Sequence, residues 1–403
     1  MSELIPLNKA LEFLLGEVVE NTSAVEVALP DALGCVLAED QQAAIDVPDF
    51  DNSAMDGYAL CTEDLGEPGC VLTVSQTIAA GHPGVALAKG TAARIFTGAP
   101  LPAGADTVVI QENTRVHDDG VAIMEIPQAG VNIRGKGHDI RKGGIVLDAG
   151  QRLRPQDLGM LASLGIARVR IKKPLQVAII NTGDEVIAPD KELQPGQIHD
   201  SNSFTLEGLL KDMGMTVLKL GVVADTLEDT EKALQEAAGK ADCIITTGGV
   251  SVGDEDHVRR AVENLGQMAL WKLAIKPGKP FSYGHVQDIP FFGLPGNPVA
   301  VFVTFVMLVA PFLLKTQGAN KLLPLHVNVK AGFEHSTAGS RLEFIRVRLV
   351  ASEQEGQILE AFGNQGSSIM TSLSWADGLA EIPLGETVEQ GQVLKFYPFR
   401  GIL

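Results

Sequence analysis

Residues 175–185 read LQVAIINTGDE, a continuous apolar run that passes directly into polar residues and a glycine. A short run of this kind is typical of a strand buried on both faces of a sheet. Helical stretches and apolar strand-like runs then alternate along the chain, in the order 203–214, 215–223, 226–240, 242–246, 257–266, 290–294 and 299–314. This alternation predicts βαβ crossovers and a doubly wound, mostly parallel α/β domain, which we place at 173–322.

The sequence around this domain predicts three further parts. Helical spacing on both sides of a β-rich stretch indicates an N-terminal helical and linker domain (1–44 and 145–172) with an inserted β module (45–144). Short strands separated by polar turns predict a C-terminal, barrel-like antiparallel β domain at 323–403. The expected fold class is therefore α/β multidomain.

Composition and charge argue against several kinds of function. Fifty acidic residues against 32 basic ones give a net charge of −18, whereas binding to nucleic acid or to an anionic membrane requires a basic face. The four cysteines form no C-x-x-C pair, so neither a zinc site nor a disulfide framework is expected. The apolar run at 299–314 is shorter than the roughly 20 residues of a membrane span, and the N-terminus lacks the basic start of a signal peptide. We expect a cytoplasmic protein with no nucleic-acid or membrane partner.

The carboxyl ends of the predicted parallel strands carry most of the unusual residues. Open α/β sheets bind their ligands at that edge. Four loops follow these ends: NTGDE (181–185), Ala224-Asp225, TTGGVSVGDED (246–256) and PGNP (295–298). Their convergence on one edge predicts a ligand site.

The loop at 246–256 combines three glycines with three carboxylates. The glycines allow backbone N–H groups to approach an anion, and a helix N-terminus that follows favours phosphate. The acids fit the same ligand if a divalent cation is bound, because Mg²⁺ takes one or two carboxylates together with substrate phosphates. We therefore expect Asp225 and Asp256 to bind Mg²⁺ or a similar ion. The alternatives are a tight turn for the glycines and helix caps for the acids.

Three lysines, Lys272, Lys276 and Lys279, recur around the turn at Pro277-Gly278. In an acidic chain such a cluster indicates a local anion site. The alternative is that these lysines are simply solvated.

Two other stretches contain more polar residues than an ordinary connection needs. In GLPGNP (293–298), Pro298 suits the first position of a helix, although the loop also fits a purely structural turn. In DVPDFDNSAMDGYAL (46–60), Asp56 precedes a glycine, where turn chemistry alone would also favour it.

Seven stretches together resemble one family, the molybdopterin molybdenumtransferases or molybdenum insertases, which include the E domain of animal gephyrin. In the family's order and at compatible spacing they are DNSAMDGYA (51–59), TGAPLPAGAD (97–106), GHDI (137–140), NTGDE (181–185), TTGGVSVGDED (246–256), KLAIKPGKP (272–280) and GLPGNPV (293–299). The resemblance extends over essentially the whole chain.

The resemblance implies a transferase of molybdenum cofactor biosynthesis. Its substrates would be molybdate and adenylylated molybdopterin, its products AMP and a molybdopterin that carries molybdenum, and Mg²⁺ or a similar divalent ion would support the step. It also implies a four-domain homodimer, whose active-site cleft is shared between the α/β domain of one subunit and the N-terminal domains of the other. Contact with the upstream adenylyltransferase is a further expectation.

The family's functional positions carry over motif by motif. The catalytic positions would be Asp56, Thr97, Asp139, Glu185, Asp225, Asp256, Lys272, Lys276, Pro295 and Pro298. The substrate-binding positions would be Thr247, Gly248, Gly249, Ser251, Lys279, Gly296, Asn297, Arg346 and Ser368, of which Arg346 and Ser368 would face molybdate. Two residues depart from the pattern. His138 replaces a usual Glu, and Ala300 replaces a Ser whose hydroxyl would lie near the oxyanion.

Two other functions remain open at this point. An adenylyltransferase that loads AMP onto molybdopterin shares the α/β unit, but that family typically reads T-T-G-G-T-G where this chain has TTGGVSVG (246–253). It also needs neither the inserted module nor the β tail. A non-catalytic scaffold on the same fold would be favoured by loss of the acids or lysines, and these are all present.

Overall fold

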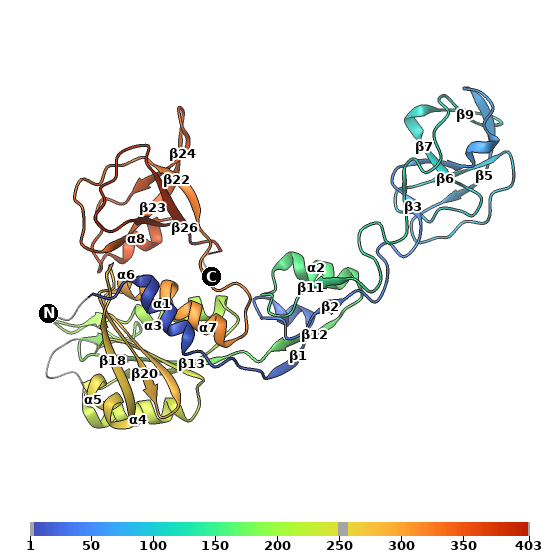
Figure 1. Cartoon of the computed structure of the whole chain (residues 1–403). Helices are drawn as coiled ribbons and strands as arrows, with labels where there is room; N and C mark the ends of the chain where they lie inside the picture. The colour runs from blue at the N-terminus through green and yellow to red at the C-terminus, as the bar shows by residue number, and fades with distance from the viewer. Residues whose placement is uncertain (1–3, 249–256, 402–403) are drawn as a thin grey trace. The chain divides into compact units, whose positions relative to one another are not determined.

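The polypeptide divides into two units (Figure 1). The structure is a computed structural model that describes residues 4–248 and 257–401. The larger unit comprises Met1–Ala38, Gly150–Arg154 and Val169–Leu403, and the smaller unit comprises Glu39–Ala149 and Pro155–Arg168. The division into four domains at 45, 145, 173 and 323 stays a prediction.

A six-stranded sheet lies at the centre of the larger unit. Its strands follow the order β16 (Thr216–Val223), β13 (Gln176–Thr182), β17 (Cys243–Thr247), β21 (Ile289–Leu294), β20 (Pro280–Val286) and β18 (Gly266–Lys272). The first four strands are parallel, whereas β20 and β18 add an antiparallel hairpin at one edge. The predicted mixed α/β class is therefore confirmed. The hairpin is an addition, because the predicted alternation contains no strand between the helix expected at 257–266 and the strand expected at 290–294.

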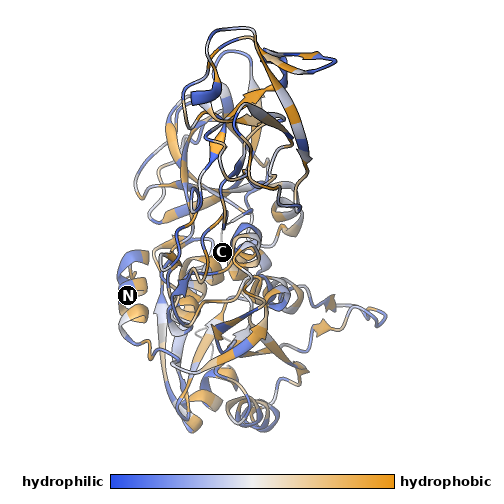
Figure 2. Cartoon of the chain, turned by 90° about the vertical axis from the view of Figure 1, so that its right-hand side faces the viewer, coloured by the Kyte–Doolittle hydropathy of each residue, from blue (hydrophilic) through white to orange (hydrophobic). Residues whose placement is uncertain are grey.

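Alternate side chains of β13 face opposite sides of this sheet, as the two-residue period of a strand requires. Val177 and Ile179 share a core with residues of α3 (Asn202–Asp212) and α1 (Leu7–Gly16). Ala178 and Ile180 share a second core with residues of α4 (Leu227–Ala238) and α5 (His257–Leu265). Hydrophobic residues, orange in Figure 2, accordingly occur along both strands and helices. Burial on both faces explains why this strand reads as a continuous apolar run.

The apolar run at 299–314 belongs to one helix that extends from Pro298 to Thr316. It consists of α6 (Pro298–Thr304), a π-helical turn η4 (Phe305–Val309) and α7 (Ala310–Thr316). By length and composition the helix would suit a membrane span, but 89% of its 18-residue apolar stretch is buried inside the protein. The predicted core helix is thereby confirmed.

The C-terminal strands close into a barrel-like sheet. In the sheet, β23 (Leu342–Ser352), β24 (Gly356–Ala361), β22 (Val327–Ala331), β26 (Val393–Pro398) and β25 (Gly378–Ile382) follow one another, and β25 pairs again with β23. These five strands pair antiparallel except for β22 and β24, which are parallel. A sixth strand, β19 (Ile275–Lys276), pairs in parallel with β23, although it lies between β18 and β20 in the chain. The helix α8 (Met370–Trp375) follows the turn after β24.

Shorter elements complete the larger unit. They are the pairs β1 (Ala24–Ala28) with β12 (Arg168–Lys172) and β14 (Val186–Ile187) with β15 (Ile198–His199), and the 3₁₀ turn η1 (Leu29–Ala32).

A second six-stranded sheet forms the smaller unit. Its order is β7 (Thr107–Ile110), β4 (Gly57–Leu60), β6 (Thr91–Ile95), β5 (Cys70–Ile78), β9 (Gly120–Ile123) and β8 (Thr114–His117). Around it lie the pairs β2 (Gln41–Gln42) with β11 (Ile145–Leu147) and β3 (Asn52–Ser53) with β10 (Ile133–Arg134), the turns η2 (Thr62–Asp64) and η3 (Gln111–Asn113), and helix α2 (Pro155–Ser163). Gly57 begins β4 where a Cβ atom would lie 2.0 Å from the carbonyl oxygen of Val109, so only glycine fits after Asp56.

Candidate active site

The carboxyl ends of β13, β17 and β21 are joined by hydrogen bonds in the larger unit. Thr247 Oγ1 donates to Asn181 Oδ1 at 2.7 Å, and both side chains are buried. The Gly248 amide donates to the carbonyl of Leu294 at 3.1 Å. The loops that follow these three strands therefore start from one fixed edge, as the sequence predicts.

Two glycines bring the loops after β17 and β21 into contact. A Cβ atom on Gly296 would lie 3.9 Å from Gly248 Cα. Gly248 has φ +86°, and a Cβ atom there would lie 3.1 Å from the carbonyl oxygen of Thr182. Glycine at 248 is thus required by backbone conformation. The predicted positions Gly249, Ser251 and Asp256 lie outside the described residues.

The loop at 295–298 packs against a turn from the C-terminal barrel. Pro295 is buried and Pro298 is the first residue of α6. Asn297 Nδ2 donates to Ser367 Oγ at 3.0 Å, and the Val299 amide donates to the Ser367 carbonyl at 3.1 Å. The exposed Ser368 is therefore held beside the start of α6, whereas Ala300 is buried within that helix.

Arg346 lies behind this turn and not on its surface. Its side chain is fully buried and donates to Ser372 Oγ at 3.0 Å and to the Gly366 carbonyl at 3.1 Å. Burial lowers the pKa of Arg346 to about 10, against the opposing charge of Glu343, so the guanidinium stays charged at neutral pH. In this structure Arg346 orients the turn that carries Ser367 and Ser368. Direct contact of Arg346 with molybdate stays a prediction.

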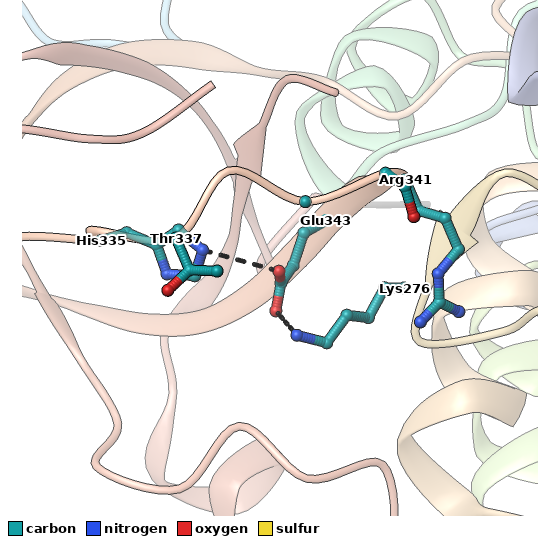
Figure 3. Close-up of a pocket in the computed structure, with 7 residues that line it drawn as sticks. Lys276, His335, Thr337, Arg341 and Glu343 are labelled. Atoms are coloured by element: carbon teal, nitrogen blue, oxygen red, sulfur yellow. Dashed lines mark ion pairs between the residues drawn. The ribbon is translucent and has the colours of Figure 1, made fainter. Parts of the chain in front are cut away.

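Lys272 is the last residue of β18, and Lys276 and Lys279 lie on the short segment between β18 and β20, Lys276 within β19. The Leu273 amide donates to the carbonyl of Lys279 at 2.8 Å, which closes the connection. Lys272 is half-buried, and Lys276 and Lys279 are exposed. Lys276 Nζ lies 2.8 Å from Glu343 Oε1 of β23 (Figure 3). The structure thus tethers one of the three lysines to the C-terminal barrel.

A cavity of about 230 Å³ lies beside this ion pair. It is lined by Lys276, His335, Thr337, Gly339, Ser340, Arg341 and Glu343. Figure 3 shows the Glu343 carboxylate between Lys276 and His335, with Arg341 extending away from it. Among the titratable side chains that line the cavity, three are basic and one is acidic, which suits an anion better than a cation.

Two predicted acids are exposed at the edge of the α/β sheet. Asp225 follows β16 and precedes α4, which Thr226 caps by accepting a hydrogen bond from the Asp229 amide at 3.2 Å. Glu185 folds over Gly183, where a Cβ atom would lie 2.6 Å from Glu185 Oε2. Asp225 is therefore available to a ligand at the edge where the loops meet.

In the smaller unit, Asp56 and Thr97 form a single cluster. The Thr97 amide and Thr97 Oγ1 each donate to Asp56 Oδ1 at 2.7 Å. These two hydrogen bonds hold the pKa of Asp56 below its usual range, with a smaller contribution from Arg94. Arg94 donates to the Gly57 carbonyl at 3.0 Å and lies over the rings of Tyr58 and Phe96. Sequence motifs point to Asp56 and Thr97 but not to the supporting Arg94.

The loop that carries Asp139 is held against residues 46–51 by an ion pair and hydrogen bonds. Lys136 Nζ lies 3.1 Å from Asp49 Oδ1, and the Lys142 amide donates to Asp46 Oδ1 at 2.8 Å. The Asp139 amide donates to the Val47 carbonyl at 3.0 Å, which leaves the exposed Asp139 side chain at the surface. Asp46 and Asp49 thus help to fix the position of the loop that carries Asp139.

Three family descriptions match consecutive parts of this chain. The MoeA N-terminal region (domain I and II) matches residues 5–165, a probable molybdopterin binding domain matches 178–315, and the MoeA C-terminal region (domain IV) matches 328–399. A molybdopterin molybdenumtransferase from Haemophilus influenzae is 38% identical, covering 99% of this chain and 100% of the relative. The chain belongs to the molybdopterin molybdenumtransferase family.

A further relative and a solved structure are also similar to this chain over most of its length. A relative of the same name from Nostoc is 37% identical over 88% of this chain and 84% of its own length. The solved structure of the molybdopterin biosynthesis MoeA protein from Pyrococcus horikoshii OT3 has a TM-score of 0.83 at 31% identity, covering 98% of this chain and all of that one.

Of the two residues predicted to bind a divalent cation, Asp225 lies within the described residues and Asp256 does not. Within residues 4–248 and 257–401, no group of three His, Cys, Asp or Glu side chains is placed to hold a metal ion. Asp225 is exposed and forms no ion pair with another described residue. One free carboxylate suits Mg²⁺, which commonly completes its coordination with water and substrate phosphates.

Proposed function

We propose that this protein takes molybdenum from molybdate, inserts it into adenylylated molybdopterin and releases AMP. The proposal is carried by the edge of the α/β sheet, where a glycine-bearing loop and the exposed carboxylate of Asp225 follow the ends of parallel strands. In this proposal they and Lys276, which is tethered by Glu343, serve one anionic ligand. The full-length similarity to molybdopterin molybdenumtransferases supports the same reaction.

The loops after β17 and β21 would bind the phosphates of the substrate. The backbone at Gly248 and Gly296 is bare enough for close approach, and the N-terminal end of α6 adds partial positive charge. Lys272, Lys276 and Lys279 would offset the charges of the phosphates and of molybdate. When bound, Mg²⁺ held by Asp225 would neutralise part of the phosphate charge.

The reaction breaks the phosphoanhydride bond between molybdopterin and AMP. The two dithiolene thiols displace one oxygen of molybdate, which leaves as water with the two thiol protons, so that two Mo–S bonds form. That water, or the molybdate oxygen before it leaves, attacks the phosphoanhydride, and its oxygen completes one phosphate while the bridging oxygen leaves with the other, which releases AMP. The protein's contribution is positioning and electrostatic stabilisation of the charge that develops on the leaving phosphate.

The hydrogen-bonded pair Asp56 and Thr97 belongs to the smaller unit, and the ion pair Lys276 and Glu343 belongs to the larger unit. We propose that a homodimer combines them, so that one subunit supplies Asp56 and its partner supplies Lys276. Such an isologous dimer would contain two identical sites. The upstream adenylyltransferase would deliver the substrate in the cytoplasm.

The test is AMP release by the purified protein from adenylylated molybdopterin with Mg²⁺, with and without molybdate. Release that requires molybdate supports insertion. Adenylylation of molybdopterin from ATP, without molybdate-dependent AMP release, would assign the protein to the preceding step. Binding of the substrate without either reaction would leave a scaffold.

A further inference from the structure

The strand pairing of β19 with β23 fixes Lys276 opposite Glu343. Ile275 pairs with Leu342 and Lys276 with Glu343 in parallel register. The Leu342 amide donates to the Ala274 carbonyl at 2.8 Å, and Arg341 Nη1 donates to the Ile275 carbonyl at 3.1 Å. The backbones under the ion pair are therefore held on both sides, independently of the two charged groups.

Glu343 is a buried carboxylate whose two oxygens both face basic side chains. Its side chain is only 6% exposed. Oε1 lies 2.8 Å from Lys276 Nζ, and Oε2 lies 3.8 Å from His335 Nε2 (Figure 3). A buried charge is costly unless it is paired, so this carboxylate requires the Lys276 ammonium. The charge of Glu343 also acts on Arg346, whose pKa it raises against the lowering effect of burial.

Lys276 differs from Glu343 in exposure. Its side chain is 48% exposed and borders the cavity of about 230 Å³. A lysine side chain beside such a space has many rotamers available, and ordering it for a ligand has an entropic cost. The ion pair selects one position of the ammonium before a ligand arrives. Glu343 thereby converts a mobile surface lysine into a fixed point charge.

We propose that Glu343 is a positioning residue for molybdenum insertion, which holds the Lys276 ammonium where it meets the anionic substrate. The inference rests on the proposed function. It predicts that the effect of Glu343 on the reaction depends on Lys276 and that Glu343 has no separate contact with the substrate. If the pair served only to hold β19 against β23, Glu343→Gln would lower the stability of the protein. Its effect on activity would then not depend on the presence of Lys276.

A double-mutant cycle separates the two roles. Glu343→Gln keeps the shape of the side chain and removes its charge, and Lys276→Ala removes the partner. We expect Glu343→Gln alone to lower kcat/KM for molybdate-dependent AMP release roughly 10- to 100-fold, and to change it less than about 2-fold in the Lys276→Ala background. Glu360→Gln is the matched control, because Glu360 Oε2 pairs with Arg348 Nε at 2.6 Å across the same sheet. The control should keep wild-type activity.

A second readout does not depend on activity. In protein labelled with ¹⁵N-lysine, the ammonium signal of Lys276, assigned from its loss in Lys276→Arg, should shift and broaden in Glu343→Gln and stay unchanged in Glu360→Gln. An unchanged signal in Glu343→Gln would overturn the proposal. The proposal would also be overturned if the fold-losses in kcat/KM of Glu343→Gln and Lys276→Ala multiply in the double variant. If the wild-type protein releases no AMP with molybdate, the proposed function fails, and the ammonium signal alone then decides whether Glu343 positions Lys276.

Discussion

Asp56 and Thr97 are joined by two hydrogen bonds to a single carboxylate oxygen, because both the amide and the hydroxyl of Thr97 lie 2.7 Å from Asp56 Oδ1. The second oxygen of Asp56 receives no hydrogen bond from another described residue, so it remains free for a ligand. One residue thus fixes the direction of the carboxylate and stabilises its charge.

Removing the Thr97 hydroxyl tests this arrangement. We expect Thr97→Val to raise the pKa of Asp56, since one of the two hydrogen bonds that lower it is lost. A lowered pKa in the folded protein stabilises it at pH values above the ordinary Asp pKa, and this contribution disappears as pH falls through the folded pKa. The stabilising effect in the wild type should therefore persist to lower pH than in Thr97→Val. A carboxyl NMR titration of Asp56 measures the shift, and an unchanged titration would contradict it.

Lys276 should be far more important for activity than other paired lysines of the C-terminal barrel. We expect Lys276→Ala to lower molybdate-dependent AMP release about 100-fold or more, as loss of a charge-stabilising group in an active site commonly does. Lys395 is the matched control, because its ammonium lies 3.0 Å from Glu381 in the same sheet. Steady-state kinetics of Lys276→Ala and Lys395→Ala measure the difference. Equal activities of the two variants would exclude Lys276 from the site.

The hydrogen bond between Thr247 and Asn181 should stabilise the edge of the α/β sheet. Thr247→Val keeps the shape but leaves the buried Asn181 Oδ1 without its donor, which should lower the free energy of unfolding by about 1–3 kcal/mol. Thr247→Ser restores the hydroxyl and should recover most of the loss. Denaturant unfolding measures both variants. A Thr247→Val variant as stable as the wild type would show that another donor or water replaces the hydroxyl.

A shared site predicts complementation between inactive variants. Asp56→Ala and Lys276→Ala homodimers should each lose most of their activity, and mixed dimers should contain one site with both residues intact. After subunit exchange of equal amounts, about a quarter of all sites would be intact if the dimers form at random. AMP release should therefore reappear in the mixture. If activity stays absent although mass spectrometry shows mixed dimers, both residues belong to sites within one chain.

The sequence predicts the α/β core well, because its central strands β13, β17 and β21 are mostly buried and helical stretches separate its strands. The helix expected at 203–214 is Asn202–Asp212, and that expected at 226–240 is Leu227–Ala238. The hairpin of β18 and β20 is different. Its strands flank the turn at Pro277-Gly278, so the local pattern indicates a connection, and their pairing is set by the rest of the sheet.

The sequence predicts site residues that belong to a local motif. It does not predict contacts between residues that lie far apart in the chain. Asp56 and Thr97 each belong to a motif, and the structure brings them together. Glu343 and Lys276 are far apart in sequence, and only the pairing of β19 with the C-terminal barrel makes them neighbours. The family resemblance predicts that Arg346 faces molybdate, and this stays a prediction. The structure adds that its side chain is buried and hydrogen-bonded to the turn at 366–372, which no local motif indicates.

The most direct measurement is the stoichiometry of AMP released to molybdenum gained by the pterin. Purified protein would react with adenylylated molybdopterin, Mg²⁺ and molybdate, with AMP measured by chromatography and pterin-bound molybdenum by reconstitution of an apo-molybdoenzyme. We predict equal amounts of AMP and pterin-bound molybdenum, and neither product when molybdate is omitted. AMP release that is unchanged without molybdate, or that yields no molybdenum-bearing pterin, would contradict the account.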